Sequence, residues 1–274
     1  MKIAICYSGF LRNIEKTHFN ILNKFKLKSH EVDYFIHTWD VPEYSLENEY
    51  ARNNIKPKIM MCESQKKFEI NPYYFINANL TASEYSDQLI KSGENKKFYD
   101  PPSKENNYCF HKDLELVKFK HYSSYPFNFL SQFYSIHKSL YFKKIYEQNN
   151  SIKYDYVIRL RTDICFHTEI DIQSFETSKI NVIASAHHKG TDLTVNDHFA
   201  CSSSDLMDIY GDCFLFIPAY YFTYNIDFIQ ELYIGHHLRV NNIPIKTVNI
   251  STSIIRDGID KECYNPNFVK DPFY

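Results

Sequence analysis

The sequence predicts an α/β protein with a mixed, mostly parallel sheet flanked by helices and one helical and loop insertion. Two observations support this fold class. Within the first sixty residues, strand patterns alternate with helical patterns, an order that produces parallel strands joined by right-handed crossovers. Later, a helical pattern at 129–146 leads directly into a strand pattern at 154–166. At 274 residues the chain can form one large domain.

The amino terminus reads as a strand at 2–7, a turn with small residues, and a helix that ends near Lys26. Gly9 lets the backbone approach a ligand closely, and the amino terminus of a helix favours anions. Ser8, Gly9 and Arg12 are therefore candidate phosphate-binding residues, although the full dinucleotide glycine pattern is absent. A solvated Arg12 is the structural alternative. The apolar positions expected on the helix are Ile14, Phe19, Ile21, Leu22 and Phe25.

Two more strands are expected, at 32–38 and 58–62. The single tryptophan, Trp39, ends the first of them and is expected to anchor the core, with stacking on a base or sugar as the alternative. Residues 66–127 are polar and rich in turn signals. They predict a partly helical insertion with a mobile loop around 92–108.

The most informative stretch is 154–166, which reads YDYVIRLRTDICF. Side chains alternate across a strand, so Arg159, Arg161 and Asp163 share one face. They lie toward the carboxyl end of the strand, where open α/β sheets bind ligands, and the planar fork of arginine matches phosphate oxygens. A buried guanidinium needs a partner, because an unpaired one costs roughly several kcal/mol. The alternative to a ligand is an acid of the chain, such as Asp155 or Asp163.

The carboxy-terminal part predicts a strand at 180–184, a helix at 205–214, a helix at 226–240 and two short strands at 245–250 and 252–256. Asp197 and His198 precede a further short strand and lie outside any periodic pattern, where catalytic residues tend to occur. A turn or cap carboxylate is the alternative for Asp197. His236 and His237 point about 100° apart on a helix and cannot both bind one ion. His236 alone is a candidate metal ligand, with an interface residue as the alternative.

Composition excludes several classes. The net charge of −2 and pI near 6.6 argue against a nucleic-acid partner. Seven cysteines without a two-residue spacing argue against a disulfide framework and a zinc site, and favour a reducing compartment. No signal peptide or membrane span is apparent. We expect a cytoplasmic protein that can still work at a membrane surface.

Three stretches together resemble a known family. KIAICYSGFLRN, YDYVIRLRTDICF and NDHFACSSSDLMDIY are similar to segments of bacterial and viral glycosyltransferases of the lipopolysaccharide and capsule polysaccharide type. Those enzymes have the Rossmann-like nucleotide-sugar transferase fold called GT-A. The resemblance covers the sheet core and not the insertion. It implies a single glycosyltransferase-like domain over residues 1–274, a nucleotide-diphosphate sugar as donor and a saccharide hydroxyl as acceptor.

The resemblance also implies roles for individual residues. It places Ser8, Gly9 and Arg12 by the nucleotide. Asp163 takes the position of the acid that binds metal and ribose, and Asp197 that of the acid near the acceptor. Many GT-A enzymes have an Asp-x-Asp pair where this chain has Arg161-Thr162-Asp163. A divalent Mn²⁺ or Mg²⁺ prefers oxygen ligands and would have one carboxylate fewer here. Arg159 or Arg161 would then compensate the charge of the departing diphosphate.

The chemistry of glycosyl transfer fits these residues. An acceptor hydroxyl is a poor nucleophile, and a carboxylate base accelerates an inverting reaction by about 10²–10⁴-fold. We expect Asp197 to be that base, or to bind the acceptor if the reaction retains configuration. The missing Asp-x-Asp pair favours a non-catalytic carbohydrate- or nucleotide-binding protein on a transferase scaffold. Another phosphate-ligand transferase is the third hypothesis, against which the absent phosphate-loop signature counts.

Overall fold

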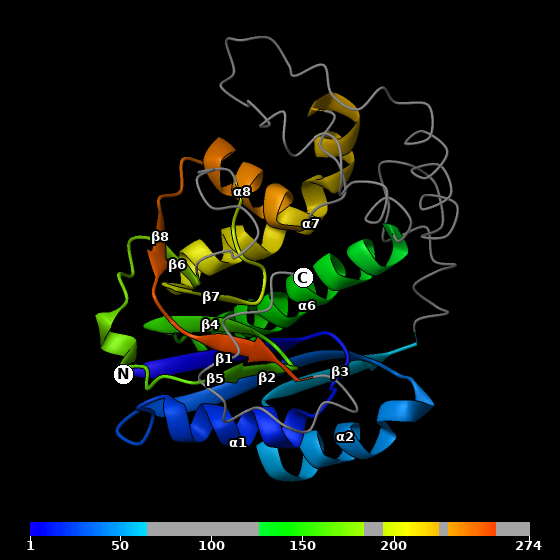
Figure 1. Ribbon diagram of the computed structural model, residues 1–274, viewed down its shortest axis with the longest axis vertical. Coiled ribbons are helices and arrows are strands. Elements are labelled where there is room, and N and C mark those ends of the chain that lie inside the picture. The colour runs from blue at the N-terminus through cyan, green and yellow to red at the C-terminus, as the bar shows by residue number, and fades with distance from the viewer. Residues whose placement is uncertain (65–125, 184–193, 225–229, 256–274) are drawn as a thin grey trace.

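The computed structural model describes residues 1–64, 126–183, 194–224 and 230–255. A seven-stranded mixed sheet lies between two layers of helices (Figure 1). The sheet consists of β1 (Lys2–Ser8), β2 (Glu31–Trp39), β3 (Ile59–Glu63), β4 (Tyr156–Arg161), β6 (Ile180–Ile183), β7 (Phe199–Ser202) and β8 (Ile245–Val248), in the order β3-β2-β1-β4-β7-β6-β8. β7 is antiparallel to both of its neighbours, and every other pair in this sheet is parallel. The α/β class with a mostly parallel sheet is therefore confirmed.

Helices cover both faces of the sheet. α1 (Ile14–Lys24) and α2 (Ser45–Tyr50) lie on one face, and α6 (Pro126–Asn150), α7 (Ser204–Tyr224) and α8 (Gln230–Val240) lie on the other (Figure 1). Alternation along β1 divides the core accordingly. Ile3, Ile5 and Tyr7 pack toward α1, while Ala4 and Cys6 pack toward α6. Among the described helices, none is both long and apolar enough to cross a membrane.

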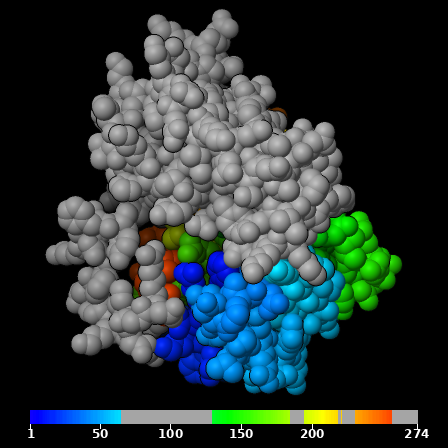
Figure 2. Space-filling model, turned by 90° about the vertical axis from the view of Figure 1, so that its right-hand side faces the viewer, coloured from blue at the N-terminus to red at the C-terminus, as the bar shows by residue number. Residues whose placement is uncertain are grey.

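The direction of strand addition reverses at β1. From β1 the chain adds β2 and β3 on one side and later returns to add β4 on the other side. Ser8 at the end of β1 is in register with Arg161 at the end of β4. A crevice at the carboxyl ends of such a strand pair is the usual ligand site of open α/β sheets. The parallel strands run from left to right in Figure 1, so this edge faces the viewer in Figure 2, with residues 1–64 in blue to cyan.

The expected strands and helices are present, with differences in detail. The strand predicted at 154–166 breaks after Arg161, and β5 (Ile164–Phe166) pairs instead with β9 (Thr252–Ile254) in a separate two-stranded sheet. The hydroxyl of Thr162 donates to the carbonyl of Phe10, and this contact helps hold the break. The helix predicted at 205–214 continues to Tyr224. Residues 65–125, with the predicted loop around 92–108, lie outside the described part, as do 184–193 and 256–274.

The apolar face predicted for the first helix is right at Ile14, Ile21 and Phe25, which are buried, and wrong at two positions. On α1, Phe19 and Leu22 are 66% and 44% exposed, whereas the apolar stripe placed them in the core. Thr17 and His18 are buried instead, and the ring of His18 lies 3.1 Å from the hydroxyl of Tyr7. Histidine counts as a polar residue, so a pattern of apolar residues does not predict that His18 is buried.

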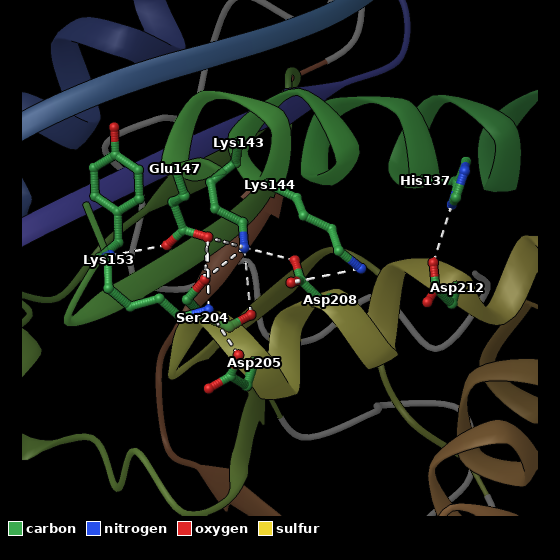
Figure 3. A network of polar contacts seen from close by, with 10 residues as sticks. His137, Lys143, Lys144, Glu147, Lys153, Ser204, Asp205, Asp208 and Asp212 are labelled. Atoms are coloured by element: carbon green, nitrogen blue, oxygen red, sulfur yellow. Dashed lines mark hydrogen bonds and ion pairs between the residues drawn. The ribbon is translucent and has the colours of Figure 1, made fainter. Parts of the chain in front are cut away.

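A buried ion-pair network fixes α6 to the beginning of α7 (Figure 3). The ammonium of Lys143 is fully buried, and its Nζ lies 3.1 Å from Glu147, 2.5 Å from Asp208 and 2.5 Å from the hydroxyl of Ser204. Glu147 also accepts from Ser204 and from the backbone of Tyr154, which precedes β4. A buried charge is tolerated when partners satisfy it, and here each donor and acceptor has one.

Replacing Lys143 with Met removes the fully buried cation that contacts both Glu147 and Asp208. We expect the free energy of unfolding in urea to fall by about 3 to 5 kcal/mol. Lys179→Met is the matched control, because Lys179 is half-exposed and pairs with the half-exposed Glu176 at 2.8 Å. An exposed pair contributes less than about 1 kcal/mol. Equal losses in the two variants would contradict this role of Lys143.

Candidate functional site

Polar side chains from five elements meet at the carboxyl edge between β1 and β4. β1 contributes Ser8, β4 and the following turn contribute two arginines and an aspartate, the segment before β7 contributes an aspartate and a histidine, and α6 and α8 contribute one residue each. These residues are Ser8, Gln132, Arg159, Arg161, Asp163, Asp197, His198 and Glu231. β7 is antiparallel, so its amino end lies at the same edge as the carboxyl ends of its neighbours.

Arg159 is completely buried beneath this edge. Its Nε donates to Ser8 Oγ at 3.0 Å, which joins β4 to the end of β1. Its Nη1 has no hydrogen-bond acceptor among the described residues. Burial lowers the pKa of Arg159, while Tyr210 and Asp197 act in the opposite direction. Arginine remains charged despite such a shift, so a buried cation here keeps an unused donor.

Arg161 and Asp163 form a bidentate ion pair across the turn that follows β4. Arg161 Nε and Nη2 donate to the two carboxylate oxygens of Asp163 at 2.9 and 3.0 Å. Burial opposes the charge on Arg161, but the hydrogen bonds and the charge of Asp163 raise its pKa overall. The pair is the structural alternative that the sequence left open. About a quarter of the Arg161 side chain, 28%, is exposed, so its guanidinium also borders the surface.

Asp197 is 4% exposed and is held by neighbours. Gln132 from α6 donates to its Oδ2, and His198 Nε2 lies 3.4 Å from its Oδ1. Burial opposes ionisation, but His198, Arg161 and Arg159 outweigh it and lower the pKa of Asp197. Burial also lowers the pKa of His198, so at neutral pH the two arginines carry most of this stabilisation. Asp197 is thus a fixed anion beside two cations.

Glu231 is a member of the group that the sequence does not mark as a site residue. It occupies the first turn of α8, and its carbonyl accepts from the backbone N–H of Val195 at 3.0 Å. Burial and the negative charge of Asp197 raise the pKa of Glu231 to about 7, against the opposing charge of Arg161. Only the fold brings α8 to Asp197. A glutamate at a helix start is ordinary in sequence, and no pattern distinguishes this one.

The turn after β1 is held from below by α6. The backbone N–H of Gly9 donates to Ser135 Oγ at 2.7 Å and to the carbonyl of His37 at 3.2 Å. Ser135 Oγ also lies 2.9 Å from His37 Nδ1. Gly9 has a φ of +110°, which favours glycine, and an added Cβ would meet no atom of the described residues within 4 Å. Among those residues, the turn is therefore hydrogen-bonded on its inner side and uncovered on its outer side.

Arg12 packs on two aromatic rings. Its guanidinium carbon is 5.3 Å from the ring centroid of Phe10 and 5.5 Å from that of Tyr44. The side chain is exposed and rests on these two rings, which are 5.7 Å apart between centroids.

Trp39 is 1% exposed, which confirms its expected place in the core.

The described residues do not fit a divalent metal ion. No group of three or more His, Cys, Asp or Glu side chains within the described ranges could hold one. Both oxygens of Asp163 are engaged by Arg161, and Mn²⁺ or Mg²⁺ requires several free oxygen ligands. His236 lies inside the α7–α8 contact, with its ring 4.5 Å from that of Tyr220. It is 5% exposed and packs between two helices, as the interface alternative predicts.

Comparison with protein-family models finds none that matches this chain, and comparison with curated proteins finds no match either.

His37 makes the fold sensitive to acid. Burial lowers its pKa from the ordinary 6.5 to about 3, with smaller effects of Lys138 and His137 in the same direction. The unfolded chain therefore binds more protons between pH 6.5 and 3, and stability falls as the pH falls through that range. At pH 4.5 this one residue should lower the free energy of unfolding by roughly 2 to 3 kcal/mol relative to pH 7. Urea denaturation of His37→Gln should show a shallower pH dependence, and parallel curves would contradict the assignment.

Proposed function

We propose that the protein is a glycosyltransferase that moves a sugar from a nucleotide-diphosphate donor to a saccharide hydroxyl, with a GT-A-like fold. The observation that carries the proposal is the fully buried guanidinium of Arg159, which has an unused N–H donor at the point where strand order reverses. The mostly parallel sheet with one antiparallel strand agrees with the sheet that the resemblance implies. A buried cation with an unused donor is suited to an anionic ligand.

The reaction requires positive charge where these arginines lie. Cleavage of the bond between the anomeric carbon and the diphosphate leaves negative charge on the diphosphate, and fixed donors stabilise that charge better than mobile water does. Arg159 supplies a buried donor, and Arg161 supplies a guanidinium that is partly exposed. Asp163 orients Arg161 through two hydrogen bonds. The open turn at Gly9 leaves room for the phosphates beside the end of β1.

In this proposal, Asp197 faces the acceptor. Asp197 is a fixed anion, and it can accept a hydrogen bond from an acceptor hydroxyl or support a neighbouring base. Because the described residues do not fit a divalent metal ion, the arginines neutralise the diphosphate in this proposal. In agreement with the expected localisation, the enzyme would work in the cytoplasm at or near a membrane surface, where surface polysaccharides are assembled.

Thermal shift with UDP, GDP, dTDP and ADP tests donor binding. We expect at least one of these nucleotides to stabilise the protein, with or without Mn²⁺. Arg161→Lys keeps the charge but loses the planar fork, and should weaken that nucleotide by about tenfold or more, equivalent to about 1.4 kcal/mol. Arg52→Lys, at an exposed arginine between α2 and β3, is the matched control and should bind as the wild type does.

Turnover distinguishes the hypotheses. Release of the nucleoside diphosphate from the corresponding nucleotide sugar, with saccharide acceptors present, supports the transferase. Nucleotide binding without any turnover would instead favour a binding protein on a transferase scaffold. Stabilisation by a sulfonucleotide alone would favour another phosphate-ligand transferase. If none of the nucleotides binds, the proposed function is wrong.

A further inference from the structure

Glu231 is anchored on both sides at the edge of the candidate site. Its own carbonyl accepts from Val195, two residues before Asp197, at 3.0 Å. The preceding residue, Gln230, donates to Gln132 at 3.4 Å, and Gln132 in turn donates to Asp197. These contacts tie the first turn of α8 to both the segment before β7 and to α6. The backbone of Glu231 is therefore held in place by two other elements, while its carboxylate is engaged only by its own backbone N–H among the described residues.

The carboxylate of Glu231 differs from that of Asp197 in its surroundings. Its own backbone N–H is the one hydrogen-bond donor among the described residues that engages it, no side chain of those residues pairs with it, and the residue is partly exposed. The carboxylate of Asp197 is buried, with one oxygen engaged by Gln132 and the other beside His198. A base must reach its substrate and accept a proton on a free oxygen. Of the two acids, Glu231 meets this requirement.

The surroundings of Glu231 and Asp197 also separate the pKa values of these two acids. Asp197 repels the negative charge of Glu231 and Arg161 attracts it, and burial raises the pKa of Glu231 to about 7. Burial raises the pKa of Asp197, but His198, the two arginines and the Gln132 hydrogen bond lower it overall. Two neighbouring carboxyl groups with pKa values driven apart commonly divide acid–base roles between them. The group that titrates near neutrality is the one suited to exchange a proton.

We infer that Glu231 is the general base of the transfer and that Asp197 is a positioning residue. This inference depends on the proposed function. The Glu231 carboxylate takes the proton of the acceptor hydroxyl while that oxygen bonds to the anomeric carbon. The bond from this carbon to the diphosphate oxygen breaks, and its electron pair leaves with the diphosphate beside Arg159 and Arg161. Because Glu231 is partly exposed, its proton then passes to water.

The test follows turnover against pH for the nucleotide sugar that corresponds to the best-binding nucleotide of the thermal-shift panel. For the wild type, kcat/KM should rise with pH through about 7 and reach a plateau, because only the ionised carboxylate accepts a proton. Glu231→Gln should lower kcat about 10²-fold or more and abolish the rise, while nucleoside diphosphate binding by thermal shift stays within about twofold. Glu15→Gln, an exposed glutamate on α1, is the matched control and should leave both readouts unchanged.

A second measurement does not depend on turnover. With ¹³C-labelled glutamate, NMR of the wild type should show a side-chain carboxyl that titrates near pH 7 and is missing in Glu231→Gln. Normal turnover in Glu231→Gln, or absence of this titration, would overturn the inference and leave the proposed function standing. Failure of every nucleotide to bind the wild type would instead overturn the proposed function, and the inference with it.

Discussion

Two arginines on the same face of β4 determine the arrangement of the carboxyl edge of the sheet. Their buried positive charges require negative charges nearby. Strand alternation places Arg159 and Arg161 on that face. The two arginines have different hydrogen-bond partners. Arg161 receives a bidentate carboxylate two residues later, whereas Arg159 receives a neutral hydroxyl, Ser8, and retains one unused donor. Asp197, brought in by an antiparallel strand, balances the remaining charge at longer range.

This balance explains the state of the neighbouring acids. Asp197 stays ionised because two arginines and a glutamine amide surround it. Burial and, after it, the fixed negative charge of Asp197 raise the pKa of Glu231, which α8 places nearby, to about 7. The contrast between the two acids therefore follows from the burial of Glu231 together with the arginines of β4 that keep Asp197 charged.

The sequence predicts the fold better than it predicts the site. Alternating strand and helix patterns suffice for the order of elements, because the central parallel strands β1, β2 and β4 are largely buried and apolar. They also place Ser8, Arg159 and Arg161 at strand ends, whereas Asp197 lies outside any periodic pattern and reaches this edge through the antiparallel pairing of β7. Glu231 is missed because no local pattern records that α8 reaches Asp197. The break after Arg161 is missed because it depends on Thr162 meeting the carbonyl of Phe10, a contact of residues far apart in the chain.

A comparison of two buried cations, Lys143 and Arg159, shows that only Lys143 is fully explained by packing. Lys143 lies among Glu147, Asp208 and Ser204, and its network is closed, so its charge is explained by the packing of α6 against α7. Arg159 is equally buried, but the described residues satisfy only part of its guanidinium. A buried donor without an acceptor costs about 1 to 3 kcal/mol. The network around Lys143 is complete, whereas the one around Arg159 is incomplete among the described residues. Arg159 also lies at the edge where α/β sheets bind ligands, so an anion bound there can complete its hydrogen bonds.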